Sequence, residues 1–312
     1  MNKGSNKLSA GLAAVSVCCF SAAVFSALRT PAVFGANVKN DYLSLQVQDD
    51  TEESGYGSYM LKKNSGDPED TLTYSQFYSS FAEIDINGSV KLFSEGSVVE
   101  KAHKDGNESV VAVQDFDGTQ ITQKLSFSTG NSNKKDMLKI EYIVENKTDE
   151  NVNVSIRSII DPTIAGTEND PIVIGTQEYT TETSFTGNDI PKEWFIYDEN
   201  GGIKAYGITS GGGQSPDSFD AADWENLYNM RFDFTAKKNI NDNAVAVSWN
   251  NKMLKSGENV VCSTKYGLYD GEKITAGPPK TGVKSCNILA AFGVCSLASA
   301  IVFRKRRTDE NE

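Results

Sequence analysis

The chain has 312 residues, and its 30 Lys and Arg against 42 Asp and Glu give a formal net charge of −12 at neutral pH. A chain this acidic repels phosphate backbones and anionic lipid headgroups, which argues against nucleic acid and membrane surfaces as partners. Its single histidine, His103, argues against catalytic triads and against histidine-based metal hydrolysis.

The first apolar segment has the pattern of a signal peptide. A short basic stretch precedes Leu8–Leu28, which is apolar and rich in Ala and Ser, and the helix-breaking Pro31 and several small residues follow. This pattern predicts a signal peptide over residues 1–36 that is cleaved between Ala32 and Asn37. The apolar run is also long enough for a retained membrane anchor, which is the alternative.

Apolar and polar residues alternate through much of the chain, as they do in half-buried β-strands. The clearest case is Leu138–Glu145, which is followed after a polar turn by Val152–Arg157, and the two segments predict an antiparallel hairpin. Asp117-Gly118 and Glu199-Asn200-Gly201-Gly202 predict two further hairpin turns. Other strands are predicted, in chain order, at Tyr42–Gln48, Ser89–Phe93, Ser109–Phe116, Ile121–Ser128, Tyr179–Phe185, Trp194–Tyr197, Ile203–Thr209, Ala244–Trp249 and Asn259–Leu268.

One segment, Asp49–Ser80, breaks this alternation because it is polar, irregular and dense in aromatic residues. Aromatic side chains in such surroundings are typical of recognition surfaces. We therefore name as candidate ligand-binding residues Tyr56, Tyr59, Tyr74, Phe77 and Tyr78. The alternative is a short helix that caps the sheets, since the last three of these residues and Phe81 have helical spacing.

A second break follows Ser215-Pro216, which has the form of a helix N-cap with proline at the first helical position. Trp224, Leu227 and Tyr228 then share one helical face, so a short helix is predicted there. We interpret its aromatic face as core packing rather than as a ligand platform.

More than ten predicted strands and one or two short helices indicate an all-β chain that forms a large antiparallel β-sandwich. Several short segments also form a diffuse pattern, namely Ile140–Asn146, Asp161-Pro162, Pro216-Asp217, Trp224, Ser248-Trp249-Asn250 and Tyr266-Gly267-Leu268. On these residues the chain resembles a large supersandwich domain that recurs in secreted bacterial proteins. The resemblance implies a supersandwich-like fold.

Few side chains indicate catalysis or metal binding. We interpret His103 as a solvated loop residue and Cys262, in an alternating strand, as a small core residue. Paired carboxylates remain a route to glycoside hydrolysis, but in so acidic a chain such pairs have almost no specificity. Asp115–Gly118 and Asp161–Asp170 offer oxygen ligands for calcium without the spacing of an EF-hand loop, and ordinary turn aspartates are the alternative. We therefore predict no catalytic residue, no metal ligand and no cofactor.

The C-terminal end contains the most specific pattern. Pro278-Pro279-Lys280-Thr281-Gly282 precedes the uncharged run Cys286–Phe303, whose length of 18 residues is about the minimum needed to cross a bilayer. A basic cluster, Arg304–Arg307, follows, as expected on the cytoplasmic side. The three parts resemble the LPXTG-type sorting signal of Gram-positive surface proteins, with Pro278 in place of leucine. The resemblance implies that a sortase cuts between Thr281 and Gly282 and joins the chain to peptidoglycan. A plain C-terminal membrane anchor is the alternative.

These signals divide the chain into a signal peptide (1–36), a β-sandwich binding domain (37–269), a linker with the sorting motif (270–282) and a transmembrane segment with a basic tail (283–312). Between Asn37 and Thr281 lie 22 of the 30 basic and 39 of the 42 acidic residues, a net charge of −17. Cys262 is the one cysteine between these positions, so no intramolecular disulfide can form there, which fits a Gram-positive surface.

The sequence thus predicts an extracellular protein that is attached covalently to the cell wall. Sortase and peptidoglycan are its predicted partners, and it meets the membrane only through the sorting helix before processing. The domain is predicted to bind a host extracellular ligand and not to be an enzyme.

The plan of one acidic β domain between a signal peptide and a sorting motif resembles the immunoglobulin-binding superantigen surface proteins of gut Firmicutes. That resemblance implies immunoglobulin, or another soluble host protein, as the ligand. One alternative is a domain that binds or processes carbohydrate, which is expected to expose Trp194, Trp224 or Trp249. The other is a structural wall or pilus subunit.

Overall fold

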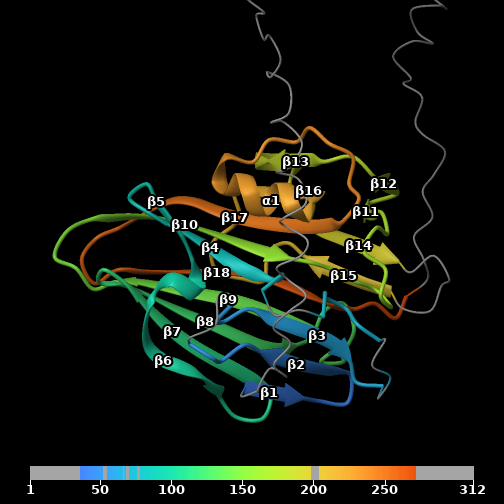
Figure 1. Cartoon of the computed structure of the whole chain (residues 1–312), viewed down its shortest axis with the longest axis horizontal. Helices are drawn as coiled ribbons and strands as arrows, with labels where there is room; N and C mark the ends of the chain where they lie inside the picture. Colours follow the sequence, from blue (N-terminus) through green and yellow to red (C-terminus); the bar gives the residue numbers. More distant parts are fainter. Residues whose placement is uncertain are drawn as a thin grey trace, which may run out of the picture. The chain divides into compact units, whose positions relative to one another are not determined.

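The strands form three antiparallel sheets in a computed structural model that describes residues 36–51, 55–65, 67, 70–75, 78–197 and 204–271 (Figure 1). The nine-stranded sheet has the order β12 (Gln177–Tyr179), β11 (Ile172–Ile174), β14 (Glu193–Tyr197), β15 (Lys204–Ile208), β18 (Asn259–Leu268), β9 (Met137–Asn146), β8 (Thr119–Ser128), β7 (Ser109–Phe116) and β6 (Ser97–Lys104). The six-stranded sheet has the order β13 (Thr183–Thr186), β16 (Ser218–Asp223), β17 (Asn243–Leu254), β10 (Val152–Ile160), β4 (Phe81–Ile86) and β5 (Ser89–Leu92). The third sheet consists of β1 (Ala36–Lys39), β2 (Leu43–Val47) and β3 (Tyr59–Lys63).

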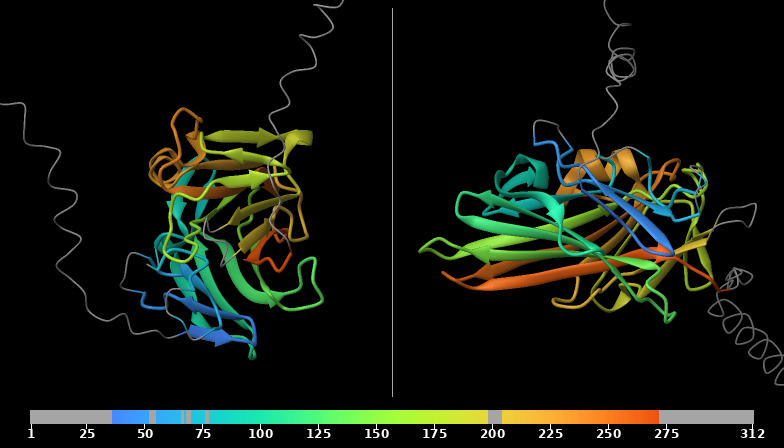
Figure 2. Two further views of the ribbon diagram at one scale, coloured as in Figure 1. Left: turned by 90° about the vertical axis from the view of Figure 1, so that its right-hand side faces the viewer. Right: turned by 90° about the horizontal axis from the view of Figure 1, so that it is seen from below.

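The two larger sheets face each other across one apolar core (Figure 1 and Figure 2). In β8, every second residue is buried, including Ile121, Leu125 and Phe127, while the alternate residues are partly exposed, so one face of this strand points into the core. Helices are short in the described part of the chain: α1 (Trp224–Met230), η1 (Phe93–Glu95), η2 (Gly187–Asp189) and η3 (Arg231–Asp233). The prediction of a large antiparallel β-sandwich with one or two short helices is confirmed.

The six-stranded sheet is covered on both faces. In β17, Val245 and Val247 belong to the core between the sheets, whereas Ala244 and Ala246 belong to a second core that includes Leu227 of α1. Figure 1 shows α1 above β17. Since both faces are covered, every residue from Asn243 to Trp249 is buried, and Ala244–Val247 form a continuous apolar run.

The prediction that Leu138–Glu145 and Val152–Arg157 form a hairpin is wrong. Both strands exist, but β9 pairs with β8 and β18 in one sheet, while β10 pairs with β4 and β17 in the other. The two strands face each other across the core, where the Tyr142 hydroxyl lies 3.4 Å from Ser158 Oγ. A period-two pattern defines which face of a strand is buried and does not define the edge with which it pairs.

Other local predictions had mixed outcomes. The Asp117-Gly118 turn joins β7 to β8 with positive φ at both residues, as a tight hairpin requires. The strand predicted at Tyr179–Phe185 is instead two strands, β12 and β13, in different sheets. The helix predicted after Ser215-Pro216 begins only at Trp224, because Ser218–Asp223 pairs with β17 as β16.

The predicted signal peptide up to Gly35, the sorting motif Pro278–Gly282, the transmembrane segment and the turn Glu199–Gly202 lie outside the described residues. Ala36, the predicted last residue of the signal peptide, is the first residue of β1. None of the helices that the structure does describe has the length and apolar character needed to span a membrane.

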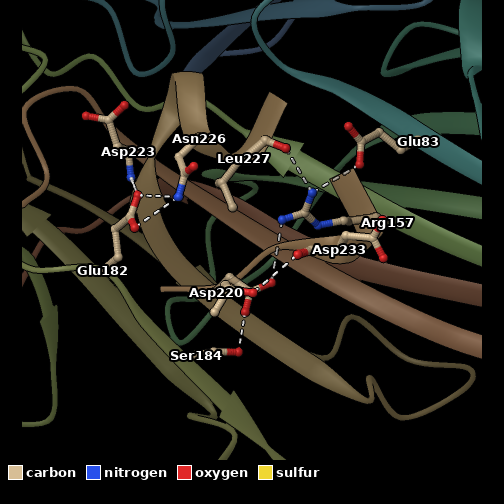
Figure 3. Close-up of polar contacts among 10 residues, drawn as sticks. Glu83, Arg157, Glu182, Ser184, Asp220, Asp223, Asn226, Leu227 and Asp233 are labelled. Atoms are coloured by element: carbon tan, nitrogen blue, oxygen red, sulfur yellow. Dashed lines mark hydrogen bonds and ion pairs between the residues drawn. The ribbon is translucent and has the colours of Figure 1, made fainter. Parts of the chain in front are cut away.

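A buried arginine holds α1 against the six-stranded sheet (Figure 3). Arg157 of β10 is 1% exposed, and its Nη1 donates hydrogen bonds to Glu83 Oε2 and to the carbonyl oxygen of Leu227, each at 3.1 Å. Its Nη2 lies 3.7 Å from Asp220 Oδ2, and Ser184 Oγ donates to Asp220 Oδ1 at 2.5 Å. Burial raises the pKa of both carboxyl groups against the opposing pull of the guanidinium.

A second buried carboxylate holds the start of α1. Glu182 accepts hydrogen bonds from Asn226 Nδ2 at 2.9 and 3.0 Å (Figure 3). It also accepts hydrogen bonds from the backbone nitrogens of Lys237 and Lys238 at 2.8 and 2.9 Å. It therefore joins α1 to the segment that leads into β17. With Arg157, it determines where the side chains of α1 lie.

Replacing Arg157 is expected to destabilise the folded protein. In Arg157→Met, Glu83 and Asp220 stay buried without their cation, so we expect a loss of about 3–5 kcal/mol in the free energy of unfolding, measured by chemical denaturation. Lys252→Met, which removes the more exposed pair with Asp217, is the control and is expected to cost less than about 1 kcal/mol. Equal losses in the two variants would contradict the role given to Arg157.

Candidate functional site

Several strand ends meet at one end of the six-stranded sheet. The antiparallel register pairs Asp223, the last residue of β16, with Asn243, the first of β17. On the other side of β17, Ile159 of β10 pairs with Phe81, the first residue of β4. The residues just beyond these ends, which are far apart in sequence, therefore gather in one place.

Two aromatic rings of α1 form a partly exposed platform at this end. Trp224 and Tyr228 stand four residues apart, one helical turn, and their rings stack with centroids 5.2 Å apart and planes 8° apart. Phe81 supports both rings edge-on at 6.5 and 5.9 Å. Trp224 is half-buried and its Nε1 donates to the carbonyl oxygen of Ser79 at 2.8 Å, while Tyr228 is 36% exposed. We call Trp224 and Tyr228 the aromatic platform.

Four acidic residues lie beside the platform: Asp161, Glu168, Asp223 and Asp242, which we call the carboxylate cluster. Backbone hydrogen bonds connect three of these residues to the neighbouring strand ends. The carbonyl oxygen of Asp242 accepts a hydrogen bond from Trp224 N at 2.8 Å, and that of Glu168 accepts one from Asn243 N at 2.7 Å. The Asp161 amide donates to Ser80 Oγ at 3.0 Å. The cluster therefore has a defined position relative to α1.

Burial and neighbouring carboxyl groups raise the pKa of two acids of the cluster, Asp242 and Asp161. Burial, followed by the charges of Glu168 and Asp223, raises the pKa of Asp242 to about 7. Burial and the charge of Asp242 raise the pKa of Asp161 well above its usual range, although a hydrogen bond from Ser79 acts in the opposite direction. Asp161 is 3% exposed, and its Oδ1 has no hydrogen-bond partner. Both shifts favour the protonated form of these two side chains.

The cluster has no neutralising cation among the described residues. No ion pair there joins Asp161, Glu168, Asp223 or Asp242 to a lysine or arginine. The same residues include no group of three or more acidic, histidine or cysteine side chains arranged to hold a metal ion.

The aromatic residues predicted from Asp49–Ser80 separate into two groups. Tyr56 and Tyr59 are core residues, 2% and 0% exposed, and Tyr56 Oη accepts a hydrogen bond from Ala102 N at 2.8 Å. Tyr74 is half-buried beside the carboxylate cluster, where burial, followed by the charge of Glu168, raises the pKa of its phenol. Tyr78 is 43% exposed, and Phe77 lies outside the described residues. Among the candidates that the structure describes, Tyr74 and Tyr78 are therefore the two that lie toward this site.

The three tryptophans also differ. Trp194 and Trp249 are completely buried, so only Trp224 remains able to contact a ligand. Cys262 is buried in the core, as predicted, and burial raises the pKa of its thiol to about 12. His103 lies on β6, rather than in a loop, and is partly exposed beside Glu100.

Two open hollows lie away from this site. One, of about 450 Å³, is lined by residues such as Asp105 and Phe127, and the other, of about 520 Å³, by residues such as Ile190, Pro191 and Thr209. Neither contains the stacked rings or the carboxylates. We place the candidate site at the platform because an aromatic ring binds a flat apolar face without needing a cavity.

Sequence reasoning found part of this site. The helical face with Trp224 and Tyr228 was recognised but interpreted as core, and Asp161 and Glu168 were considered only as calcium ligands. Asp223 and Asp242 were missed. In the sequence, both residues stand at or next to the end of a strand, which could have drawn attention to them. Their proximity to each other, however, depends on the pairing of β16 with β17.

The arrangement can perform two tasks. The partly exposed rings can pack against the C–H face of a sugar ring, which is apolar. Asp242, with a pKa near neutrality, can donate or accept a proton, and the carboxyl group of Glu168 lies close enough to influence it. Two carboxyl groups of unequal pKa are the usual requirement for glycoside chemistry.

Comparison with known proteins gives no family. No protein-family model and no curated protein matches the chain. Solved structures similar to it include a galactose mutarotase related enzyme from Lactobacillus acidophilus, with 10% identity over 77% of this chain and 97% of that one and a TM-score of 0.42.

Two further similar structures have comparable values. A putative aldose 1-epimerase from Escherichia coli K12 has 10% identity over 75% of this chain and 98% of that one, with a TM-score of 0.43. A galactose mutarotase-like protein from Lactobacillus casei has 9% identity over 75% and 99%, with a TM-score of 0.44. The fold assigned here rests on the strand pairing of this chain itself.

One sequence-based prediction is corrected by these findings. The chain was predicted not to be an enzyme, but the structures similar to it include one described as an enzyme. The physical weakness of the prediction was its reliance on the single histidine, since carboxyl groups alone can supply the acid and the base.

The raised pKa of Asp242 predicts a pH-dependent stability. The folded protein holds this proton more tightly than the unfolded chain, since folding raises the pKa from 3.8 to about 7. This contribution to stability is fully present below about pH 4 and is lost as the pH rises through 7. The difference in free energy of unfolding between Asp242→Asn and wild type is therefore expected to shift by about 1–2 kcal/mol in favour of the variant between pH 4 and pH 8. This range allows for the exposed part of the side chain.

Urea denaturation of both proteins across this pH range measures the effect. Asp189→Asn, which removes an exposed carboxylate of η2, controls for the loss of one charge. A constant difference between Asp242→Asn and wild type at all pH values would contradict the coupling within the cluster.

Proposed function

We propose that the β-sandwich domain binds a glycan at the aromatic platform and that Asp242 transfers a proton to or from the bound sugar. The observation that supports this most directly is the stacked pair Trp224 and Tyr228, partly exposed beside Asp242, whose pKa is raised to about 7. Stacking orients the sugar ring, and the adjacent carboxyl groups then lie next to its hydroxyl groups. This proposal takes the carbohydrate alternative in preference to a host protein ligand.

The aromatic platform stands on a helix whose position is fixed by hydrogen bonds, as a specific binding site requires. Its rings stand on a helix held by Arg157 through Leu227 and by Glu182 through Asn226. Rings fixed in this way lose little conformational entropy when a ligand binds.

Trp224→Ala is expected to weaken glycan binding at least about tenfold, because the larger ring of the stacked pair is removed. A glycan array identifies the ligand, and calorimetry measures the affinity. Tyr179→Ala is a matched control, since Tyr179 forms an edge-on pair with Phe185 away from the platform. An array on which wild type binds no glycan, or a Trp224→Ala variant with unchanged affinity, would overturn the proposal.

Immunoglobulin binding stays a prediction. A pull-down from serum with the same protein tests it, and retention of immunoglobulin that Trp224→Ala does not reduce would indicate a protein-binding surface elsewhere.

We also propose that the domain acts at the cell wall, to which a sortase attaches it through Thr281. The support is the three-part C-terminal pattern of motif, apolar run and basic cluster.

Thr281→Ala is expected to move the protein from the wall fraction, released by muramidase, to the membrane fraction, as immunoblotting of the fractions detects. Lys280→Ala, which changes the variable position of the motif, is the control and is expected to stay in the wall. Equal amounts of the two variants in the wall fraction would contradict sortase attachment.

A further inference from the structure

The ring geometry of the aromatic platform limits which part of it a ligand can reach. The planes of Trp224 and Tyr228 are 8° apart and their centroids are 5.2 Å apart, so each ring covers one face of the other. Two rings that shared a plane would instead offer a continuous strip to successive sugars. In this pair, the one face of each ring that a ligand can use is the outer face, which points away from the partner ring.

Phe81 lies beside the pair and covers neither outer face. Its centroid is nearly equally far from the two rings, at 6.5 Å from Trp224 and 5.9 Å from Tyr228, and its plane is turned by 77° and 80° from theirs. A ring above the outer face of Tyr228 would lie much farther from Trp224 than from Tyr228. Phe81 therefore supports the two stacked rings from the side.

The two outer faces differ in how far they are exposed. Trp224 is half-buried, and its Nε1 donates to the carbonyl oxygen of Ser79 at 2.8 Å. Tyr228 is 36% exposed, although Trp224 covers one face of its ring and Phe81 lies against one side. What remains exposed on Tyr228 is the outer face of the ring with its rim.

The other exposed ring near this end of the sheet does not continue that face. Tyr78 is 43% exposed, but it directly precedes Ser79, whose carbonyl oxygen binds the Trp224 indole. Its backbone therefore adjoins the edge of Trp224 rather than the outer face of Tyr228. Among the described residues, the rings that pack on Tyr228 are those of Trp224 and Phe81, so no coplanar ring extends its outer face there.

We propose that the platform recognises the end of a glycan chain: one terminal pyranose stacks on the outer face of Tyr228, and the rest of the chain extends into solvent. A pyranose and a phenol ring are of similar size, so one ring face holds one sugar. Trp224 is then a positioning residue, which backs the Tyr228 ring and maintains its orientation. This inference rests on the proposed function, because it assigns the class of ligand for the same site.

An internal segment of a polysaccharide would gain little at such a site. Each further sugar needs a stacking partner of its own to add binding free energy, and the geometry of the platform supplies one free ring face. We therefore expect the affinity to change by less than about threefold from a disaccharide to a hexasaccharide of the same sugar.

A glycan array with the full chain in detergent tests which part of a glycan is recognised. The array contains chains of one to six residues of glucose, mannose, galactose, xylose and N-acetylglucosamine. It also contains mixed chains that differ only in their terminal or only in their internal sugar. We expect binding to follow the terminal sugar and to tolerate changes farther along the chain. Calorimetry then measures the affinity against chain length for the terminal sugar that binds best.

Saturation-transfer NMR on the tetrasaccharide of that sugar identifies the residue that contacts the protein. The C–H protons of the terminal residue are expected to receive at least about threefold more saturation than those of the internal residues, because only the terminal ring lies on Tyr228.

Substitutions distinguish the roles of the two rings. Tyr228→Ala removes the contact face and is expected to weaken binding about tenfold or more, whereas Tyr228→Phe keeps the face and is expected to stay within about threefold of wild type. Trp224→Phe keeps a stacked support and is expected to restore most of the affinity that Trp224→Ala loses. Tyr179→Ala, which removes a partly exposed tyrosine elsewhere, is the control. Thermal unfolding of each variant verifies that it is folded.

Tyr228→Ala also gives the sharpest contrary result. If the sugar stacked on Trp224 instead, this substitution would uncover a face of Trp224, and the variant would bind as tightly as wild type or more tightly.

The outcomes separate this inference from the proposed function. Chain-end recognition is overturned by array binding that follows the internal sugar, by affinity that rises about tenfold or more with chain length, by saturation spread evenly along the chain, or by undiminished binding in Tyr228→Ala. In each of these cases glycan binding at the platform stands as long as Trp224→Ala weakens it. If no glycan on the array binds, both proposals are lost.

Discussion

The architecture of the candidate site depends on the buried guanidinium of Arg157. It lies on the face of the six-stranded sheet that α1 covers, and it bonds to Glu83 of β4, to the backbone of Leu227 and, through charge, to Asp220 of β16. A helix of seven residues is too short to be stable alone, so its position comes from such contacts. The stack of Trp224 on Tyr228 therefore exists in this orientation because a cation from a neighbouring strand holds the backbone between them.

The same sheet contains two groups of acidic residues with opposite surroundings. Glu83 and Asp220 share one arginine, which offsets part of the cost of burying their charge. Asp161 and Asp242, at the end of the sheet, are influenced mainly by burial and by other carboxylates. The first arrangement is typical of a structural ion network, whereas uncompensated acids with raised pKa values are typical of functional sites. Proximity to exposed aromatic rings strengthens that distinction here.

Strand positions could be predicted because alternation depends only on nearest neighbours along the chain, and β7 and β18 have the predicted bounds. The pairing of the strands could not be predicted, as β9 and β10 demonstrate. Each has an apolar face, and these faces meet across the core, whereas the two strands lie in different sheets. The same limit applies to tyrosines. Tyr59 and Tyr78 come from one aromatic-rich segment, yet the first is completely buried and the second is exposed. Composition cannot separate them, because burial depends on what packs against each ring.

The sequence by itself determined the β-sandwich class, most strand positions and the burial of Cys262, since these follow from local hydrophobic patterning. It also supplies the terminal signals on which the proposed wall attachment rests. Only the tertiary structure decided that Asp161, Glu168, Asp223 and Asp242 lie together beside Trp224. A carboxyl group's pKa depends on the charges and solvent within a few ångströms, and here those charges come from strand ends that antiparallel pairing joins across long stretches of chain. That dependence on distant neighbours is why the acids could be counted in the sequence but not recognised as a site.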